Sequence, residues 1–214
     1  MSIRYKWPDY TITLEETGSY KNLRSMWRGE RGFTKLNFLL GRITQNPGSL
    51  YTGGTQSNLI VVDSELPITG YKASFKWINN TQLRIHSEPW EVAWCLFDYL
   101  DDVHFSYVIV KPNGLEIGRV NGVRDNQQFV YTSDHTWYVL KRTMTLDIAR
   151  DGDNVTVTVK GKVVTGNGVV NYDVLEQTVV VIPFKYKDGV TSEVCDVALY
   201  TEDCEVNWLG VAVA

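Results

Sequence analysis

The stretch Asn154-Val155-Thr156-Val157-Thr158-Val159-Lys160 alternates strictly between polar and apolar residues. Because successive side chains of a β-strand point to opposite faces, this alternation predicts a half-buried strand with its valines toward a core and its threonines toward solvent. The segment 144–150 alternates in the same way, and Asp151-Gly152-Asp153 between the two is typical of a hairpin turn in which glycine supplies a positive φ. The sequence therefore predicts an antiparallel hairpin over residues 144–160.

Strand patterns recur outward from this hairpin in both directions, whereas helix patterns are nearly absent. Gly161-Lys162 is expected to form a second tight turn, and a short helix or irregular arm is expected only at 18–32, where charged residues are crowded. Further strands are expected at 59–62, 71–77, 82–86, 92–99, 104–111, 115–120, 136–140, 178–182, 194–200 and 204–213. Many short strands separated by Gly, Asn and Asp are typical of sandwiches and barrels. We therefore predict one all-β domain over residues 1–214, a two-sheet antiparallel jelly-roll sandwich with little or no helix.

The composition restricts the classes of partner. The net charge is -4 and the sequence pI is about 5.4, so no broad basic field attracts nucleic acid or an anionic membrane. No segment approaches the roughly 20 apolar residues of a membrane span, and the N-terminal residues do not resemble a leader. These features predict a protein made in the cytosol without a signal peptide, located in the cytoplasm or on a virion surface, with no nucleic-acid or membrane partner.

The cysteines, Cys95, Cys195 and Cys204, are odd in number and lack zinc-site spacing. If 201–203 is the turn between two strands, alternation places Cys195 on the face opposite to Cys204, and their sulfurs cannot meet. We therefore expect three reduced thiols, which agrees with a cytosolic origin.

A polar strand face is expected near residue 84. On a strand over 82–86, Gln82, Arg84 and His86 share one face, while Leu83 and Ile85 share the other. Arg84 and His86 are expected to face solvent, because an inward charge without a partner is costly. The large aromatics Trp90, Trp94 and Phe97 are read as core residues instead, because such side chains are mostly buried.

A second polar face is expected on the strand 104–111, where Tyr107 and Lys111 point to the same side. If the two faces are neighbours, they form a surface of aromatic rings, cations and carboxylates. Such a surface suits a sugar, whose C–H face stacks on aromatic rings and whose hydroxyls need charged and amide partners. The candidate ligand-binding residues are Gln82, Arg84, His86, Glu91, Tyr107, Lys111 and Glu116.

Signals for catalysis and for metal are weaker. A glycoside hydrolase needs two carboxylates roughly 5 to 10 Å apart, but Glu88 and Glu91 flank Pro89-Trp90 and Glu116 stands alone. A lyase needs a base such as a histidine or tyrosine beside a cation, and those residue types are present. No catalytic residue and no cofactor are assigned. Calcium at one of the acidic turns 101–102, 151–153 or 202–203 stays open, although none has the twelve-residue calcium-loop pattern.

Five motifs in the second half of the chain resemble those of concanavalin A-like lectin/glucanase jelly-roll domains, a group with LamG- and glycosidase-like members. They are Gln82-Leu83-Arg84, Trp90-Glu91-Val92-Ala93-Trp94, His104-Phe105-Ser106-Tyr107, Lys111-Pro112-Asn113-Gly114-Leu115-Glu116-Ile117-Gly118, and Ala198-Leu199-Tyr200-Thr201-Glu202-Asp203 with Val206-Asn207-Trp208. Motifs in a fixed order are more specific than any one of them. The resemblance covers 55–214 and leaves 1–54 as an N-terminal extension.

The resemblance implies a lectin/glucanase-type sandwich, some of whose relatives bind or cleave polysaccharide and some of which are labelled calcium-binding. This chain departs from the relatives at Leu115 and Ser106, where they carry aromatic residues, and at 121–130, where their Pro/Gly segment is replaced. The leading hypothesis is a non-catalytic module that binds a glycan or a protein surface on one sheet face. The alternatives are a polysaccharide lyase or glycoside hydrolase, and a structural protein of a virion that forms homo-oligomers or a larger assembly.

Overall fold

The computed structural model of the chain describes residues 2–7, 10–15, 23–28, 33–37, 42–47, 57–123, 126–164, 170–185 and 189–214, which form strands and connections without any helix. The strands are β1 (Ser2–Trp7), β2 (Tyr10–Glu15), β3 (Leu23–Arg28), β4 (Phe33–Asn37), β5 (Arg42–Asn46), β6 (Ser57–Pro67), β7 (Gly70–Gln82), β8 (Ala93–Asp101), β9 (His104–Lys111), β10 (Gly114–Asn121), β11 (Gln127–Thr132), β12 (Thr143–Asp151), β13 (Asn154–Val164), β14 (Val170–Val180), β15 (Val194–Glu202) and β16 (Cys204–Val213). The described part of the chain therefore offers no helix that could cross a membrane.

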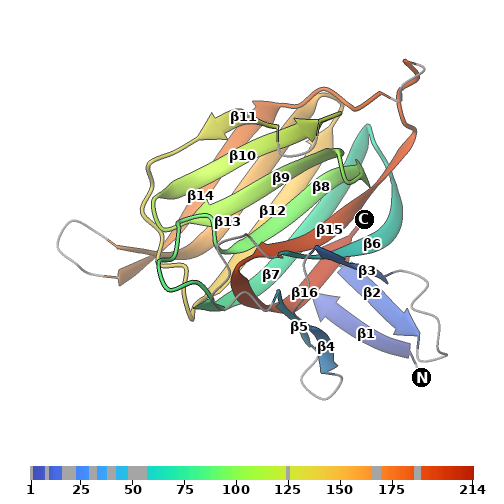
Figure 1. Cartoon of the computed structure of the whole chain (residues 1–214). Helices are drawn as coiled ribbons and strands as arrows, with labels where there is room; N and C mark the ends of the chain where they lie inside the picture. Colours follow the sequence, from blue (N-terminus) through green and yellow to red (C-terminus); the bar gives the residue numbers. More distant parts are fainter. Residues whose placement is uncertain are drawn as a thin grey trace.

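Two seven-stranded sheets lie face to face, and β1 and β2 form a separate two-stranded ribbon (Figure 1). The front sheet has the order β11-β10-β9-β8-β15-β6-β3, and the back sheet has the order β14-β13-β12-β7-β16-β5-β4. All the strand pairs in the two sheets are antiparallel. β15 and β16 follow each other in the sequence but occupy central places in different sheets. This confirms the predicted two-sheet jelly-roll sandwich.

The central hairpin is confirmed in detail. β12 pairs with β13 so that Ile148 lies opposite Val157, and Gly152 in the turn has a φ of 57°. Val155, Val157 and Val159 are completely buried, whereas the threonines between them are partly exposed. The alternating pattern therefore placed this strand with the correct face toward the core.

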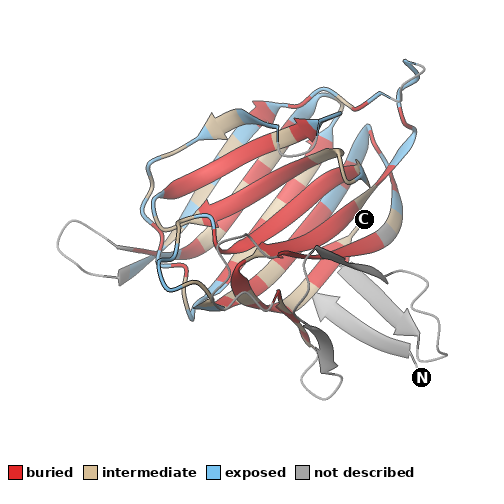
Figure 2. Ribbon diagram, viewed as in Figure 1, coloured by how far each residue is buried: buried red, intermediate tan, exposed pale blue. Residues whose placement is uncertain are grey.

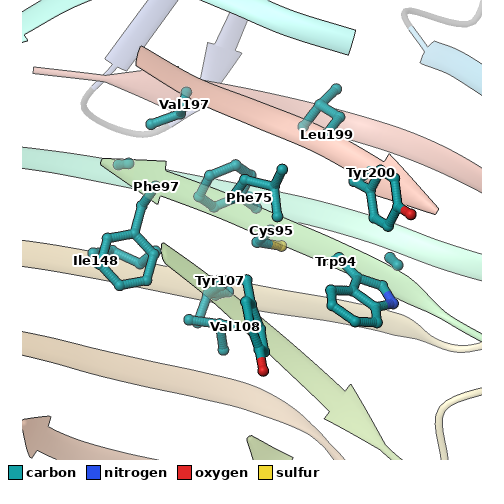
Figure 3. Close-up of a cluster of buried hydrophobic side chains, with 14 of the residues drawn as sticks. Phe75, Trp94, Cys95, Phe97, Tyr107, Val108, Ile148, Val197, Leu199 and Tyr200 are labelled. Atoms are coloured by element: carbon teal, nitrogen blue, oxygen red, sulfur yellow. The ribbon is translucent and has the colours of Figure 1, made fainter. Parts of the chain in front are cut away.

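The core fills the space between the sheets. Cys95, Phe97, Val108, Val197 and Leu199 project from the front sheet toward residues of the back sheet such as Phe75 and Ile148 (Figure 3). The middle strands of the front sheet are buried along almost their whole length (Figure 2). These strands are therefore covered on both faces, as their nearly continuous apolar sequences require.

Three expectations about local structure were wrong. β7 ends at Gln82, so 83–86 belong to a loop, and Gln82, Arg84 and His86 do not share a strand face. The segment 136–140 forms only isolated bridges. β13 runs through the expected turn at Gly161. A side chain at this position would collide with Met144 of β12, so glycine here lets β12 and β13 pack closely.

The N-terminal segment contributes strands to both sheets. The expected arm at 18–32 contains β3, which pairs with β6 at the edge of the front sheet, so the strand replaces the predicted irregular structure. β5 pairs with β16 and extends the back sheet to β4. Residues 1–54, which lie outside the family resemblance, therefore supply edge strands of the sandwich.

All three cysteines are free and buried, as predicted. Cys195 lies in the front sheet and Cys204 in the back sheet, so the two are separated by the change of sheet at 203 and not by a hairpin turn. Burial raises the pKa of each thiol. A raised pKa lowers the thiolate fraction at neutral pH and with it the reactivity.

We expect alkylation under non-reducing conditions to modify three thiols in denaturant and almost none in the native protein. Mass spectrometry of the intact chain measures both numbers. A mass that shows an intramolecular bridge in the denatured sample would contradict the assigned strand positions.

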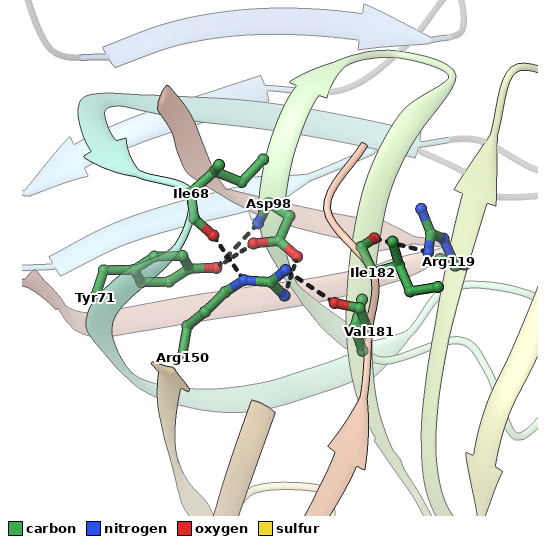
Figure 4. Close-up of polar contacts among 7 residues, drawn as sticks. All are labelled: Ile68, Tyr71, Asp98, Arg119, Arg150, Val181 and Ile182. Atoms are coloured by element: carbon green, nitrogen blue, oxygen red, sulfur yellow. Dashed lines mark hydrogen bonds and ion pairs between the residues drawn. The ribbon is translucent and has the colours of Figure 1, made fainter. Parts of the chain in front are cut away.

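A buried ion pair joins the two sheets near one end of the sandwich (Figure 4). Arg150 Nη1 of β12 donates to Asp98 Oδ2 of β8 at 2.8 Å, and Tyr71 Oη donates to Asp98 Oδ1 at 2.8 Å. The remaining Arg150 groups donate to the carbonyls of Ile68 and Val181 at 2.7 and 2.8 Å. Asp98 sits at an irregularity of β8 with a φ of 47°, which turns its carboxylate toward Arg150. Burial raises the pKa of Asp98 to about 6, although Arg150 and the hydrogen bond from Tyr71 oppose this rise.

Candidate functional site

The loop between β7 and β8, residues 83–92, is held in one conformation by hydrogen bonds to its own backbone. Gln82 Nε2 donates to the carbonyls of Glu88 and Glu91 at 3.1 and 3.2 Å. Trp94 Nε1 donates to the carbonyl of Trp90 at 3.0 Å, and the Val92 amide donates to the same oxygen at 2.8 Å. The first residue of the predicted site, Gln82, thus positions the loop.

The loop presents two large apolar side chains to solvent. Ile85 is 72% exposed and Trp90 is 40% exposed, and His86 beside them is exposed as well. Trp90 was read as a core residue, and the structure corrects this: the loop fixes the backbone of Trp90 while its indole remains accessible. An exposed indole on a fixed backbone is a suitable platform for the C–H face of a sugar.

Arg84 and two buried carboxylates lie at the base of the loop. Arg84 Nη1 is 3.4 Å from Glu91 Oε1 and 3.8 Å from Asp203 Oδ2, and the Arg84 side chain is 29% exposed, whereas both acids are fully buried. Neither oxygen of Glu91 accepts a hydrogen bond. Burial raises the pKa of Glu91, and the neighbouring Asp203 adds to the rise while Arg84 opposes it.

We expect Arg84→Ala to destabilise the domain by about 3 kcal/mol near pH 8, because it leaves the Glu91 carboxylate buried without a cation. The loss should be smaller at pH 5 than at pH 8, because the pKa of Glu91 is raised by burial and the carboxyl is therefore easier to protonate as the pH falls. Urea unfolding at the two pH values measures this difference. Arg142→Ala is the control, because Arg142 is exposed and contacts a ring and a carbonyl rather than an acid. Equal stability of the two variants would contradict a structural ion pair at Arg84.

The other predicted residues form a second cluster on β9 and β10. Tyr107 Oη lies 3.1 Å from Glu116 Oε1 and 3.2 Å from Gln127 Oε1, and its single proton is shared between these two acceptors, while Lys111 Nζ donates to Glu116 Oε2. Tyr107 is completely buried and its ring lies against Gly118, where a side chain would collide with it. Burial and the nearby Glu116 carboxylate raise the pKa of Tyr107. Of Tyr107, Lys111 and Glu116, only Lys111 retains appreciable exposure, with 18% of its side chain accessible.

Trp94 connects the loop to this second cluster. Its ring centroid lies 5.0 Å from that of Tyr107 and 5.5 Å from that of Tyr200 (Figure 3). The strand register places these three rings and Glu116 on the face of the front sheet that points away from the back sheet. The structure therefore brings the predicted residues together in two groups, which Trp94 connects. Glu91, Tyr107 and Glu116 are buried within these groups and support the neighbouring side chains.

The sequence did not single out several residues of this arrangement. Asp203 approaches Arg84 because β7 and β16 are neighbours in the back sheet. Gln127 reaches Tyr107 because β11 and β9 flank β10 in the front sheet, and Tyr200 packs on Trp94 because β15 pairs with β8. The motif 198–203 could have drawn attention to Asp203, because this residue ends the motif and lies where the chain crosses from the front sheet to the back sheet. The exposure of Trp90 could have been recognised from its neighbours, because Glu88 and the turn-forming Pro89 precede it and Glu91 follows it.

The acidic turns do not gather ligands for a metal. Asp101 Oδ1 accepts from the Val103 amide and contacts His104 Nδ1, and Asp102 Oδ1 accepts from Tyr99 Oη. Within the described ranges, no three His, Cys, Asp or Glu side chains come together as they do around a metal ion. In the turn 101–102 both carboxylates are thus already engaged by protein groups.

Several solved structures share the architecture of this chain. The chain is similar to the VIP36 exoplasmic/lumenal domain in its Ca²⁺/Man3GlcNAc-bound form, with a TM-score of 0.59, 11% identity, and coverage of 94% of this chain and 86% of that one. The chain has the concanavalin A-like jelly-roll fold. It is also similar to the legume lectin-like domain from Entamoeba histolytica (TM-score 0.53, 8% identity, coverage 91% and 90%). A third similar structure is the carbohydrate recognition domain of Emp46p in its potassium-bound form (TM-score 0.52, 10% identity, coverage 99% and 95%).

The solved structures also correct one prediction. We had assigned the protein to the cytosol, but the VIP36 domains with the same fold are exoplasmic and lumenal, which contradicts that assignment. No family model matches the sequence, and no curated protein matches it either. The shared fold is therefore what the comparisons establish.

Proposed function

We propose that this domain is a carbohydrate-recognition module and that its ligand binds at the β7–β8 loop. The observation that carries the proposal is the exposed indole of Trp90, whose backbone is fixed by hydrogen bonds from Trp94 and Val92. A rigid aromatic platform stacks on a sugar ring with little loss of conformational entropy.

The polar groups beside Trp90 suit the hydroxyls of a sugar. Arg84 is half-buried and held by Glu91, so its remaining N–H groups are oriented before a ligand arrives. His86 is exposed on the same loop and can donate or accept. In this proposal Arg84, His86 and Trp90 contact the glycan, Gln82 and Glu91 position the loop, and Tyr107, Lys111 and Glu116 support Trp94 from the sheet.

The lectin-like neighbours support this proposal at the level of the fold. The VIP36 domain has been solved with bound Man3GlcNAc, and the Emp46p domain is a carbohydrate recognition domain. Proteins with the same fold can bind different ligands, so glycan binding at the Trp90 loop has to be tested in this chain.

We expect a glycan identified on an array to bind about tenfold more weakly to Trp90→Ala, because the variant loses the stacking platform. The melting temperature should stay nearly unchanged, since the indole is exposed. Isothermal titration and a thermal melt measure the two quantities.

Phe129→Ala is the control, because Phe129 is an exposed aromatic residue on β11 and lies outside the loop. Equal loss of affinity in both variants would place binding elsewhere. Release of reducing ends or of unsaturated uronate products during incubation would favour the lyase or hydrolase alternative instead.

A further inference from the structure

A separate pocket of about 270 Å³ lies where β10 ends and where the chain leaves β14 toward β15. Its lining consists of Arg119, Asn121, Ile182, Pro183, Phe184 and Lys185. β10 ends beside the start of β9 and hence at the far end of β8 from the β7–β8 loop. With about 3.3 Å per residue along the nine residues of β8, the pocket is roughly 30 Å from Trp90.

Arg119 is held in place inside this pocket. Its guanidinium carbon lies 4.1 Å from the centroid of the Phe184 ring, and Nη1 donates to the Ile182 carbonyl at 3.0 Å (Figure 4). Phe184 is itself buried, and His104 packs against its edge with the centroids 5.9 Å apart. The guanidinium therefore has a fixed plane, which is the geometry that recognises planar or tetrahedral oxyanions.

The positive charge of Arg119 has no counter-ion among the described residues. The acid that acts on it electrostatically is Asp98, whose two oxygens already accept from Arg150 and Tyr71. The Arg119 Nε is buried and makes no hydrogen bond, and burial lowers the pKa of the guanidinium. A second cation, Lys185, lines the same pocket without an acidic partner in the described ranges.

We propose that this pocket binds an oxyanion, the carboxylate or phosphate group of a small ligand, between the Arg119 guanidinium and the Lys185 ammonium. The Arg119 and Lys185 cations, the Asn121 amide and the Phe184 ring line this pocket, and no acid is among its described lining residues. A half-buried cation without a counter-ion is costly, and an anionic ligand removes that cost. The proposal is independent of glycan binding at the β7–β8 loop, because the two sites lie at opposite ends of β8.

The test is a titration of the full chain with four probes. Binding is monitored by ¹H–¹⁵N NMR spectra that include the arginine Nε–H signals. Glucuronate and glucose 6-phosphate carry the two candidate oxyanions, inorganic phosphate tests the bare anion, and glucose is the neutral control. We expect saturable shifts around Arg119 and Phe184 with at least one anionic probe and none with glucose. Whether glucuronate or the phosphates bind identifies the source of the oxyanion.

Arg119→Gln should weaken the binding of the anionic probe at least tenfold, because it removes a charge-assisted contact. Arg142→Gln is the matched control, since Arg142 also stacks on an aromatic ring and donates to a carbonyl, but on the open surface. Lys185→Gln provides a second variant at an exposed position if Arg119→Gln does not fold, and it should weaken binding as well. Absence of binding by every anion, equal binding of glucose, or unchanged affinity in Lys185→Gln would overturn the proposal. Trp90→Ala should leave these titrations unchanged, which separates this site from the proposed glycan site.

Discussion

Val157→Asp is expected to unfold the domain. Val157 is completely buried in β13 and faces the core beside Ile148, so the variant places a carboxylate in the interior with no partner. Such burial costs several kcal/mol, and the total stability of a domain of this kind is on the order of 10 kcal/mol. Circular dichroism and one-dimensional NMR of the purified variant should show loss of the folded signals at 25 °C.

Thr156→Asp is the matched control on the other face of the same strand. Thr156 is partly exposed, and its hydroxyl lies 2.9 Å from that of Thr178 on β14. The variant loses one surface hydrogen bond, which costs about 1 kcal/mol. Similar unfolding of both variants would mean that the alternation of β13 does not divide core from surface.

Arg150→Met is expected to lower the free energy of unfolding by about 3 to 5 kcal/mol at pH 8. The variant removes the cation that neutralises Asp98 in the interior and leaves the carbonyls of Ile68 and Val181 without their donors. Without Arg150 the pKa of Asp98 in the folded state rises further above its unfolded value. The destabilisation caused by the unpaired Asp98 carboxylate is therefore absent at low pH, and it develops as the pH rises through and beyond about 6.

Urea unfolding of Arg150→Met at pH 5 and pH 8 tests both parts of this expectation. The double variant Arg150→Met with Asp98→Asn should recover part of the loss at pH 8, because asparagine tolerates the positive φ of this position and carries no charge. A loss below 1 kcal/mol at both pH values would mean that the pair contributes little to stability.

The strands could be predicted because alternation and turn residues can be recognised without knowing which strands pair in the sheets. The valines of β13 and the glycine of its turn follow from alternation and turn chemistry alone, and the structure confirms both. The prediction that 82–86 form a polar strand face was wrong, and the local pattern gives no sign of the reason. Alternation from Gln82 to His86 resembles a strand, but the Gln82 amide binds the carbonyls of Glu88 and Glu91 and bends the segment into a loop.

Contacts between distant segments account for the rest of the candidate site. Arg84 finds Asp203 only because β7 and β16 are neighbours in the back sheet. The Asp98–Arg150 pair was not predicted, since a single aspartate in an apolar strand gives no indication of a partner in the other sheet. The same holds for Arg119, whose pocket is completed by residues that follow β14.

The central positions of β15 and β16 have a consequence for how the chain acquires its structure during synthesis. β15 joins β8 to β6 in one sheet, and β16 joins β7 to β5 in the other, although both strands come last in the sequence. Pairings between such distant residues give a high contact order, which slows folding. Before β15 and β16 have been synthesised, each sheet consists of two halves with open inner edges. Such edges are prone to pair with other chains, so the emerging polypeptide should depend on chaperones until β15 and β16 leave the ribosome.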